Sequence, residues 1–146
     1  MTLNDLTKLA MMKKIAEHPL IPLHALPPVR PFKDASSNEL TRAIVEFVRL
    51  TGHYADRINN TGIYDKRTGK WRKGGTRKGI SDIIANKMIE HQGRRFSIMV
   101  AIEVKVGKDK MSEHQIKVQS EVQNSGGVYI IAKTWEQFYQ DWQSIK

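Results

Sequence analysis

Residues 96–106 read Phe-Ser-Ile-Met-Val-Ala-Ile-Glu-Val-Lys-Val, and this stretch predicts a long strand inside a sheet. Successive residues of a strand point to opposite faces, so one face carries the aliphatic side chains at every second position from residue 98 to residue 106. The opposite face carries Glu103 and Lys105 side by side. Burying two charges in so apolar a strand is unfavourable unless they pair, bind a metal or serve a function.

The segments after this strand predict a parallel strand pair. A helix is expected at 112–124, a strand at 128–132 and a terminal helix at 134–145. The first of these helices has Ile116, Val118 and Val122 on its apolar side, and a glycine pair follows it. A strand, a helix and a second strand in this order favour a right-handed crossover between parallel strands.

The segments before the strand predict the rest of the sheet and one covering helix. Residues 36–50 repeat apolar side chains at three- and four-residue steps, which is typical of a helix. The other expected elements are a strand at 53–58, a hairpin from Ile63 to Trp71, a strand at 79–85 and a polar connection at 86–96. This order predicts an α/β fold in which a central mixed sheet of four or five strands is flanked by helices.

A proline-rich segment sets residues 1–34 apart from a compact domain at 35–146. All five prolines lie between His18 and Phe32, where they disfavour helix interiors and central strands. The residues before them predict a short helix with one apolar edge. This N-terminal arm either packs on a partner chain or lies on its own domain.

The composition favours a polyanionic partner. The 146 residues include 24 basic and 15 acidic side chains, a net charge of +9, and such a surface binds nucleic-acid phosphates with release of counterions. The chain contains no cysteine, which excludes disulfides, thiolate zinc sites and cysteine nucleophiles. No apolar run approaches ~20 residues and the first residues lack a signal-peptide pattern, so we expect no membrane segment and a cytoplasmic location.

The acidic residues near Lys105 suit a magnesium site. Mg²⁺ is usually held by one or two carboxylates with water oxygens. Asp82 and Glu103 are expected to supply these carboxylates from neighbouring strands, and the Val104 carbonyl adds a third oxygen. Lys105 then orients an attacking water or stabilises charge on phosphorus. The alternative is a surface ion pair between Glu103 and Lys105 on a half-exposed strand.

Two further candidates, Glu39 and Gln115, have a competing structural role. They end the patterns Ser-x-x-Glu at 36–39 and Ser-x-x-Gln at 112–115, which are typical of helix capping boxes. From residue types alone the cap is favoured for Glu39, whereas Gln115 either caps or holds a catalytic water or phosphate oxygen near Lys105. The five histidines show no metal-ligand spacing, which argues against zinc.

The segment from Lys66 to Lys78 favours contact with nucleic acid. It contains seven basic residues and no acidic residue. Basic side chains on a glycine-containing hairpin suit a phosphate backbone, and a tryptophan can stack on a base. The alternatives are a solvated basic loop and, around Asn60, a plain turn. The candidate DNA contacts are Arg57, Asn60, Arg67, Lys70, Trp71, Arg72, Lys73, Arg77 and Lys78.

Residues 36–133 resemble the PD-(D/E)xK nuclease superfamily, and most closely its VRR-NUC family. The matching stretches are Asn38-Glu39-Leu40, Arg57-Ile58-Asn59-Asn60-Thr61-Gly62, Lys78-Gly79-Ile80-Ser81-Asp82-Ile83, Ile102-Glu103-Val104-Lys105, Ser112-Glu113-His114-Gln115 and Gly126-Gly127-Val128. Their order along the chain is more specific than the Glu-x-Lys pattern alone. The arm at residues 1–32 is not explained by the family pattern.

The resemblance implies a restriction-endonuclease-like fold and phosphodiester cleavage that depends on Mg²⁺ or Mn²⁺. It implies metal ligation by Asp82 and Glu103 together with Glu39, and it adds Lys105 and Gln115 to the active site. Stand-alone members of the family are common in phages, resemble Holliday-junction resolvases and are often homodimers, so a phage protein would act in the host cytoplasm.

The leading hypothesis is therefore a metal-dependent DNA endonuclease that selects branched or duplex DNA by its structure. One alternative is a nucleic-acid-binding module without catalysis. The other is an accessory subunit whose arm docks onto a replication or recombination complex.

Overall fold

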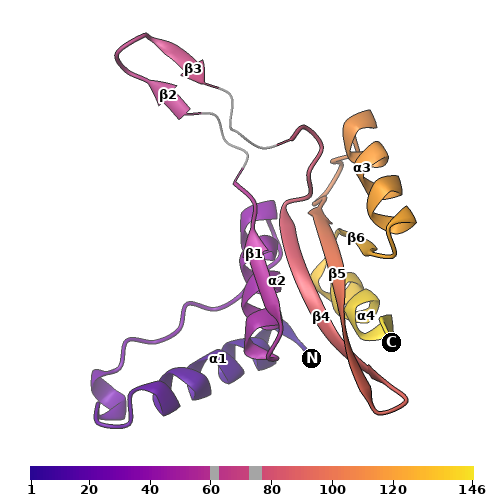
Figure 1. Ribbon diagram of the computed structural model, residues 1–146. Coiled ribbons are helices and arrows are strands. Elements are labelled where there is room, and N and C mark those ends of the chain that lie inside the picture. The colour runs from indigo at the N-terminus through magenta and orange to yellow at the C-terminus, as the bar shows by residue number, and fades with distance from the viewer. Residues whose placement is uncertain (60–62, 73–76) are drawn as a thin grey trace.

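The computed structural model describes residues 1–59, 63–72 and 77–146, which form an α/β fold (Figure 1). The helices are α1 (Leu3–Glu17), the 3₁₀ turn η1 (Leu23–Ala25), α2 (Ser37–Leu50), α3 (Glu113–Asn124) and α4 (Trp135–Ser144). The strands are β1 (Tyr54–Arg57), β2 (Ile63–Asp65), β3 (Lys70–Arg72), β4 (Ile83–His91), β5 (Arg94–Val104) and β6 (Val128–Ala132).

The main sheet has four strands in the order β1-β4-β5-β6, and β2 and β3 form a separate hairpin. β4 pairs antiparallel with β1 and β5, whereas β5 and β6 are parallel and are joined through α3. The predicted mixed sheet flanked by helices is therefore confirmed, as is the parallel pair. In this register Ile83 lies opposite Ile102, which brings the start of β4 next to the end of β5.

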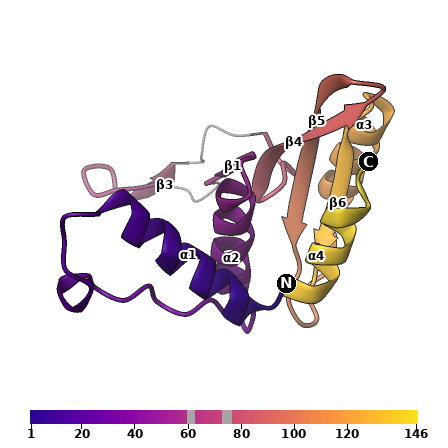
Figure 2. The ribbon, with the colours of Figure 1, turned by 90° about the horizontal axis from the view of Figure 1, so that it is seen from below.

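Two helical layers enclose the sheet (Figure 2). The main core lies on the face that α2 and α4 cover, and it contains Val100, Ile102 and Val104 of β5. A smaller apolar cluster lies on the opposite face, where Val118 and Val122 of α3 pack against β5 and β6. The two faces of β5 thus bury alternate residues, as the sequence predicts.

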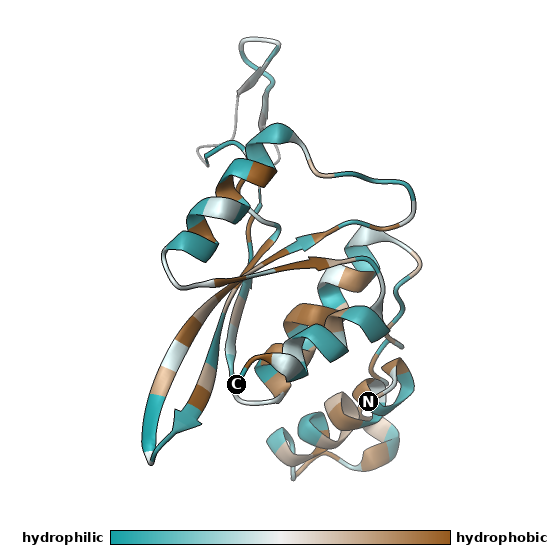
Figure 3. Cartoon of the chain, turned by 90° about the vertical axis from the view of Figure 1, so that its right-hand side faces the viewer, coloured by the Kyte–Doolittle hydropathy of each residue, from teal (hydrophilic) through white to brown (hydrophobic). Residues whose placement is uncertain are grey.

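The hairpin that connects β4 and β5 corrects the sequence-based boundaries. The strand expected at 79–85 continues to His91, and the predicted polar connection at 86–96 is mostly strand. A turn at Gln92 and Gly93 reverses the chain, with φ angles of 51° and 71°. The outer half of this hairpin is exposed, which explains its polar residues (Figure 3).

Helix α3 has a narrower buried stripe than expected. Ile116 was predicted on the apolar side, but it is 51% exposed. Only Val118 and Val122 are buried on this helix, one turn apart. The helix therefore contacts the sheet through one row of side chains, which pack with Ala101 of β5 and Tyr129 of β6.

The N-terminal arm lies on its own domain. Leu6 of α1 is fully buried in the main core, and Trp135 Nε1 of α4 donates a hydrogen bond to the Met1 carbonyl at 2.9 Å. Arg42 of α2 lies 4.3 Å from the centre of the Phe32 ring and donates to the Arg30 and Pro31 carbonyls. These contacts attach the first residue of the arm to α4 and its last residues to α2.

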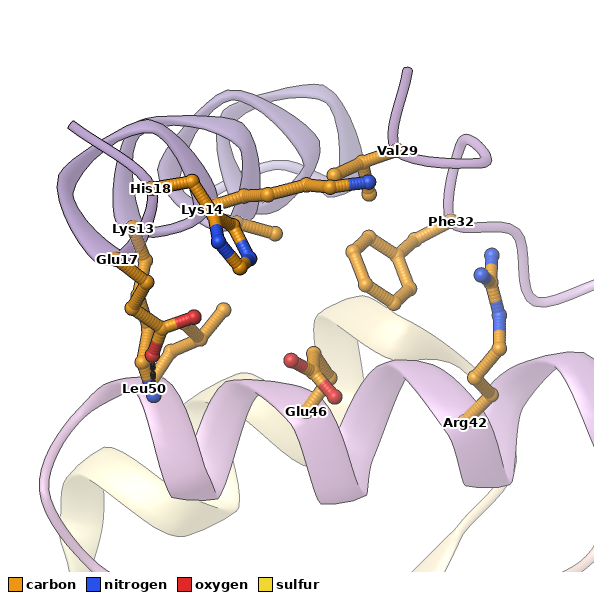
Figure 4. Close-up of a pocket in the computed structure, with 10 residues that line it drawn as sticks. Lys13, Lys14, Glu17, His18, Val29, Phe32, Arg42, Glu46 and Leu50 are labelled. Carbon is orange, nitrogen blue, oxygen red and sulfur yellow. Dashed lines mark ion pairs between the residues drawn. The ribbon is translucent and has the colours of Figure 1, made fainter. Parts of the chain in front are cut away.

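A pocket of about 430 Å³ lies between α1, the arm and α2 (Figure 4). Its apolar lining includes Phe32 and Leu50, and the Glu46 carboxylate projects from α2 between them. Every lining residue lies between residues 10 and 50, so the pocket contains none of the candidate residues from Asp82 onward. Among the described residues no helix is long and apolar enough to cross a bilayer.

Candidate functional site

Asp82 lies directly before β4 and is held by both neighbouring strands. Its carbonyl accepts a hydrogen bond from Ile58 N at 2.8 Å, and its carboxylate oxygen Oδ2 accepts one from Val104 N at 2.9 Å. Extending the antiparallel register by one residue places Asp82 opposite Glu103, and directly opposed residues share a face of the sheet. The two carboxylates therefore lie on the α3 side.

Glu103 is the most deeply buried charged residue of the site, with 2% of its surface exposed. Its oxygen Oε1 lies 3.1 Å from Lys105 Nζ and also accepts a hydrogen bond from Gln115 Nε2. The other oxygen, Oε2, is buried and has no hydrogen-bond partner in the described chain. One side of the carboxylate is thus fixed by the protein, while the other remains available to a cation or a donor.

Lys105 is the second charged residue on this face of β5. It is 6% exposed, and its ammonium bridges Glu103 at 3.1 Å and Asp109 at 3.2 Å. Burial lowers the pKa of Lys105, but the hydrogen bonds and charges of both carboxylates outweigh this effect and raise it. The alternative, a surface ion pair on a half-exposed strand, does not describe this arrangement, because both Glu103 and Lys105 are buried.

Gln115 serves two roles through one amide group. Its Oε1 accepts a hydrogen bond from Ser112 N at 2.8 Å, which completes the capping box at the start of α3. Its Nε2 donates to Glu103. The predicted cap is therefore present, and the contact with Glu103 is one that the sequence did not predict. The position of α3 is thereby linked to the carboxylate.

The electrostatic environment raises the pKa of the Glu103 carboxyl. Burial and the charge of Asp82 together raise it from 4.5 to about 7, against the opposing hydrogen bond and charge of Lys105. Positive charge near the two carboxylates lowers this pKa, as Lys105 does in part.

The donor set fits a cation that keeps much of its water shell. In residues 1–59, 63–72 and 77–146 no group of three or more His, Asp or Glu side chains is arranged to hold a metal ion. Two carboxylates on adjoining strands remain, and Mg²⁺ requires only one or two. The unpartnered Oε2 of Glu103 is the observation that makes the fit specific.

Glu39 is not brought into this group. It lies at the start of α2, where its backbone N–H donates to Ser36 Oγ at 3.3 Å. Its carboxylate accepts from the Ser36 hydroxyl at 3.2 Å and lies 3.8 Å from Arg30. Glu39 thus folds back onto Ser36, as a capping role predicts. Its carboxylate contacts the Ser36 hydroxyl and not the Ser36 backbone amide.

The basic hairpin presents several candidate contacts to solvent. Trp71 is 72% exposed, and its ring lies 5.5 Å from that of Tyr64 on the paired strand. Arg67 and Lys70 are exposed in the same hairpin. Figure 1 shows this hairpin at one end of the molecule and the β4–β5 turn at the other. Arg72 belongs to β3, and Asn60 and Lys73 lie outside the described residues.

Two of the predicted DNA contacts have partners within the chain. Arg57 donates to Asn38 Oδ1 at 2.7 Å. Arg77 pairs with Glu121 of α3 through both guanidinium nitrogens, at 2.6 and 2.7 Å. Arg77 therefore attaches the segment that follows the hairpin to α3. Lys78 is exposed.

Tyr129 of β6 is a residue of this region that sequence reasoning missed. It lies opposite Ala101 and is 8% exposed, and its hydroxyl is buried without a hydrogen-bond partner in the described chain. The signal available in the sequence was weak, because a tyrosine in a strand is usually part of the core.

The structure thus brings Asp82, Glu103, Lys105 and Gln115 together and leaves Glu39 at the start of α2. In chemical terms, two carboxylates, an ammonium group and an amide converge on the face of the sheet that α3 covers. No family model, curated protein or solved structure matches this chain.

Proposed function

We propose that this protein is a divalent-cation-dependent endonuclease that hydrolyses phosphodiester bonds in DNA. The single observation that carries the proposal is the environment of Glu103, a buried carboxylate with one oxygen held by Lys105 and Gln115 and the other unpartnered. A buried ionisable group with a raised pKa, charged partners and an unsatisfied oxygen is typical of a functional site.

The residues divide the work as follows. Asp82 and Glu103 would hold Mg²⁺ or Mn²⁺, with the Val104 carbonyl as a further oxygen. A cation there would supply polarisation of the phosphoryl group and a more acidic water. Gln115 keeps the Glu103 carboxylate in place. Lys105 stabilises negative charge that develops on the phosphate or orients the attacking water. Because Lys105 is already fixed between two carboxylates, its position requires little reorganisation.

The substrate proposal follows from charge. The chain carries a net charge of +9, and the exposed residues of the β2–β3 hairpin include Arg67, Lys70 and Trp71. Basic side chains engage the phosphate backbone, and an exposed aromatic ring stacks on unpaired bases. Preference for branched DNA and assembly as a homodimer belong to the proposal through the family resemblance.

Cleavage assays test the proposal directly. A four-way junction, a flap and a plain duplex are incubated with the protein in Mg²⁺ or Mn²⁺. Wild type is expected to cut at least one of them, while Asp82→Asn and Lys105→Ala lower the rate by about 100-fold or more. Glu90→Gln is the matched control because Glu90 is exposed in the outer part of β4. Equal cutting by wild type and both site variants would contradict the proposal.

A DNA-binding module without catalysis is the second candidate, and the small donor set favours it. Among the described residues no third acidic or histidine ligand joins the two carboxylates, and fewer charged ligands give a lower affinity for a cation. Calorimetry with Mn²⁺ distinguishes the two functions. An endonuclease binds Mn²⁺ and loses this binding in Glu103→Gln, whereas a module shows no binding that the substitution removes.

A further inference from the structure

Two buried oxygens without partners lie in the same layer of the molecule. They are Oε2 of Glu103 and the hydroxyl of Tyr129, and in the described chain no other buried side-chain nitrogen or oxygen lacks a hydrogen bond. Leaving one such group unsatisfied costs about 1–3 kcal/mol. Two of them in one region therefore indicate that both need a hydrogen-bond partner from outside the chain.

The strand register explains how Tyr129 comes close to the carboxylates. Tyr129 pairs with Ala101 in the parallel β5–β6 ladder, and Ala101 precedes Glu103 by two residues on the same face. Its neighbours in the smaller apolar cluster are Val118 and Val122 of α3, Ala101 itself and Ile84 of β4. In the sheet register Ile84, Ala101 and Tyr129 lie in one row across β4, β5 and β6, so the residue beside Tyr129 on β5 is a small alanine.

The charge environment agrees with this placement. Burial raises the pKa of the Tyr129 hydroxyl, and the charges of Glu103 and Asp82 raise it further. Tyr129 therefore remains a neutral O–H donor near two acceptor groups. It is the group that the carboxylates need, since an ionised carboxylate only accepts hydrogen bonds.

We propose that Tyr129 is a positioning residue of the cation site: its hydroxyl holds a water molecule that also contacts Oε2 of Glu103 and orients this carboxylate. This inference rests on the proposed function. A buried water typically makes about three hydrogen bonds to groups that are otherwise unsatisfied, and these two oxygens supply an acceptor and a donor. Neighbours that orient a metal ligand typically change metal affinity by 10–100-fold when removed.

The test compares Tyr129→Phe with wild type by Mn²⁺ calorimetry at a temperature where both are folded. The substitution removes only the hydroxyl and keeps the ring that packs against α3. We expect the dissociation constant for Mn²⁺ to rise about 10-fold. Tyr139→Phe is the matched control, since Tyr139 packs beside Trp135 on α4, in the main core on the opposite face of the sheet, and should leave the constant unchanged.

Urea unfolding in EDTA separates this role from a purely structural one. Without a cation, Tyr129→Phe should be nearly as stable as wild type, because the hydroxyl bonds to water and not to another group of the described chain. Suppose that wild type binds Mn²⁺ tightly and that Tyr129→Phe has the same dissociation constant. This result would overturn the inference and leave the proposed function standing. Absence of Mn²⁺ binding by wild type would overturn both.

Discussion

At the scale of single residues, Glu103 links stability to pH. Its carboxyl is buried beside Asp82, which raises its pKa from 4.5 to about 7. In the unfolded chain the Glu103 carboxyl loses its proton near the ordinary pKa, and in the folded chain it does so near the raised pKa. Between these two pH values the folded state therefore binds more protons than the unfolded state. The contribution of Glu103 to the free energy of unfolding is therefore fully present below pH 4.5 and is lost as pH rises through about 7.

The corresponding prediction concerns Glu103→Gln. The raised pKa of Glu103 corresponds to at most about 3 kcal/mol of stability. Glutamine resembles the protonated carboxyl but does not titrate. In EDTA, the free energy of unfolding of wild type should drop between pH 5 and pH 8, and that of Glu103→Gln should change less. Urea titrations at both pH values measure this. Glu90→Gln, an exposed control, should follow wild type; an equal drop in Glu103→Gln would contradict the assignment.

The residues of the site differ in how far sequence could predict them. Glu103 and Lys105 share a face because alternation in a strand follows from covalent geometry. The pattern Ser-x-x-Gln identified Gln115 as a helix cap, whereas the family resemblance implied a place for it in the site. Tyr129 was not, since its position depends on the β5–β6 register and on the small side chain of Ala101, which are set only when the sheet assembles.

At the scale of elements, the approach to β4 lies directly against the start of α3. Gly79 has φ of 81°, and a Cβ at this position would lie 2.4 Å from the His114 carbonyl oxygen of α3. A backbone atom cannot move aside as a flexible side chain would. This contact therefore sets the spacing between the segment that carries Asp82 and the helix that carries Gln115.

Gly79→Ala should consequently destabilise the protein and displace the site. Gly52 provides the control, because its φ of 83° is equally unfavourable for alanine but nothing lies within 4 Å of the added Cβ. We expect Gly52→Ala to lower the free energy of unfolding by about 1 kcal/mol and Gly79→Ala by roughly 2 kcal/mol more. Equal losses in urea unfolding would show that the close approach to His114 does not exist in solution.

The β4–β5 hairpin shows why element boundaries were harder to predict than element types. The sequence between Asn86 and Phe96 is polar, and polarity is typical of a connection. In the structure these residues continue both strands. Lys87 still contacts the Trp142 and Ile145 carbonyls, but most of the residues beyond it are exposed, so no apolar alternation is required. The Gln92-Gly93 turn was the available signal, because glycine at a positive φ is typical of two-residue hairpin turns.

At the scale of the whole molecule, the N-terminal arm is part of the core. Leu6 is fully buried among residues of α2 and α4, which contradicts a freely projecting arm. Leu6→Ala should lower the free energy of unfolding by about 2–5 kcal/mol. Met12→Ala on the same helix should change it by less than ~0.5 kcal/mol, since Met12 is 67% exposed. Similar small effects of both substitutions would mean that α1 is detached in solution.

The three tryptophans of the chain are divided between two environments. Trp135 and Trp142 are 4% and 1% exposed in the core, whereas Trp71 is 72% exposed on the β2–β3 hairpin. Their fluorescence should therefore contain a blue-shifted component that iodide cannot quench and a red-shifted component that it can. Unfolding should alter the blue-shifted component, and binding of a ligand to the β2–β3 hairpin should alter the red-shifted component. An unlabelled sample thus carries two separate optical reporters, and Trp71→Phe silences only one of them.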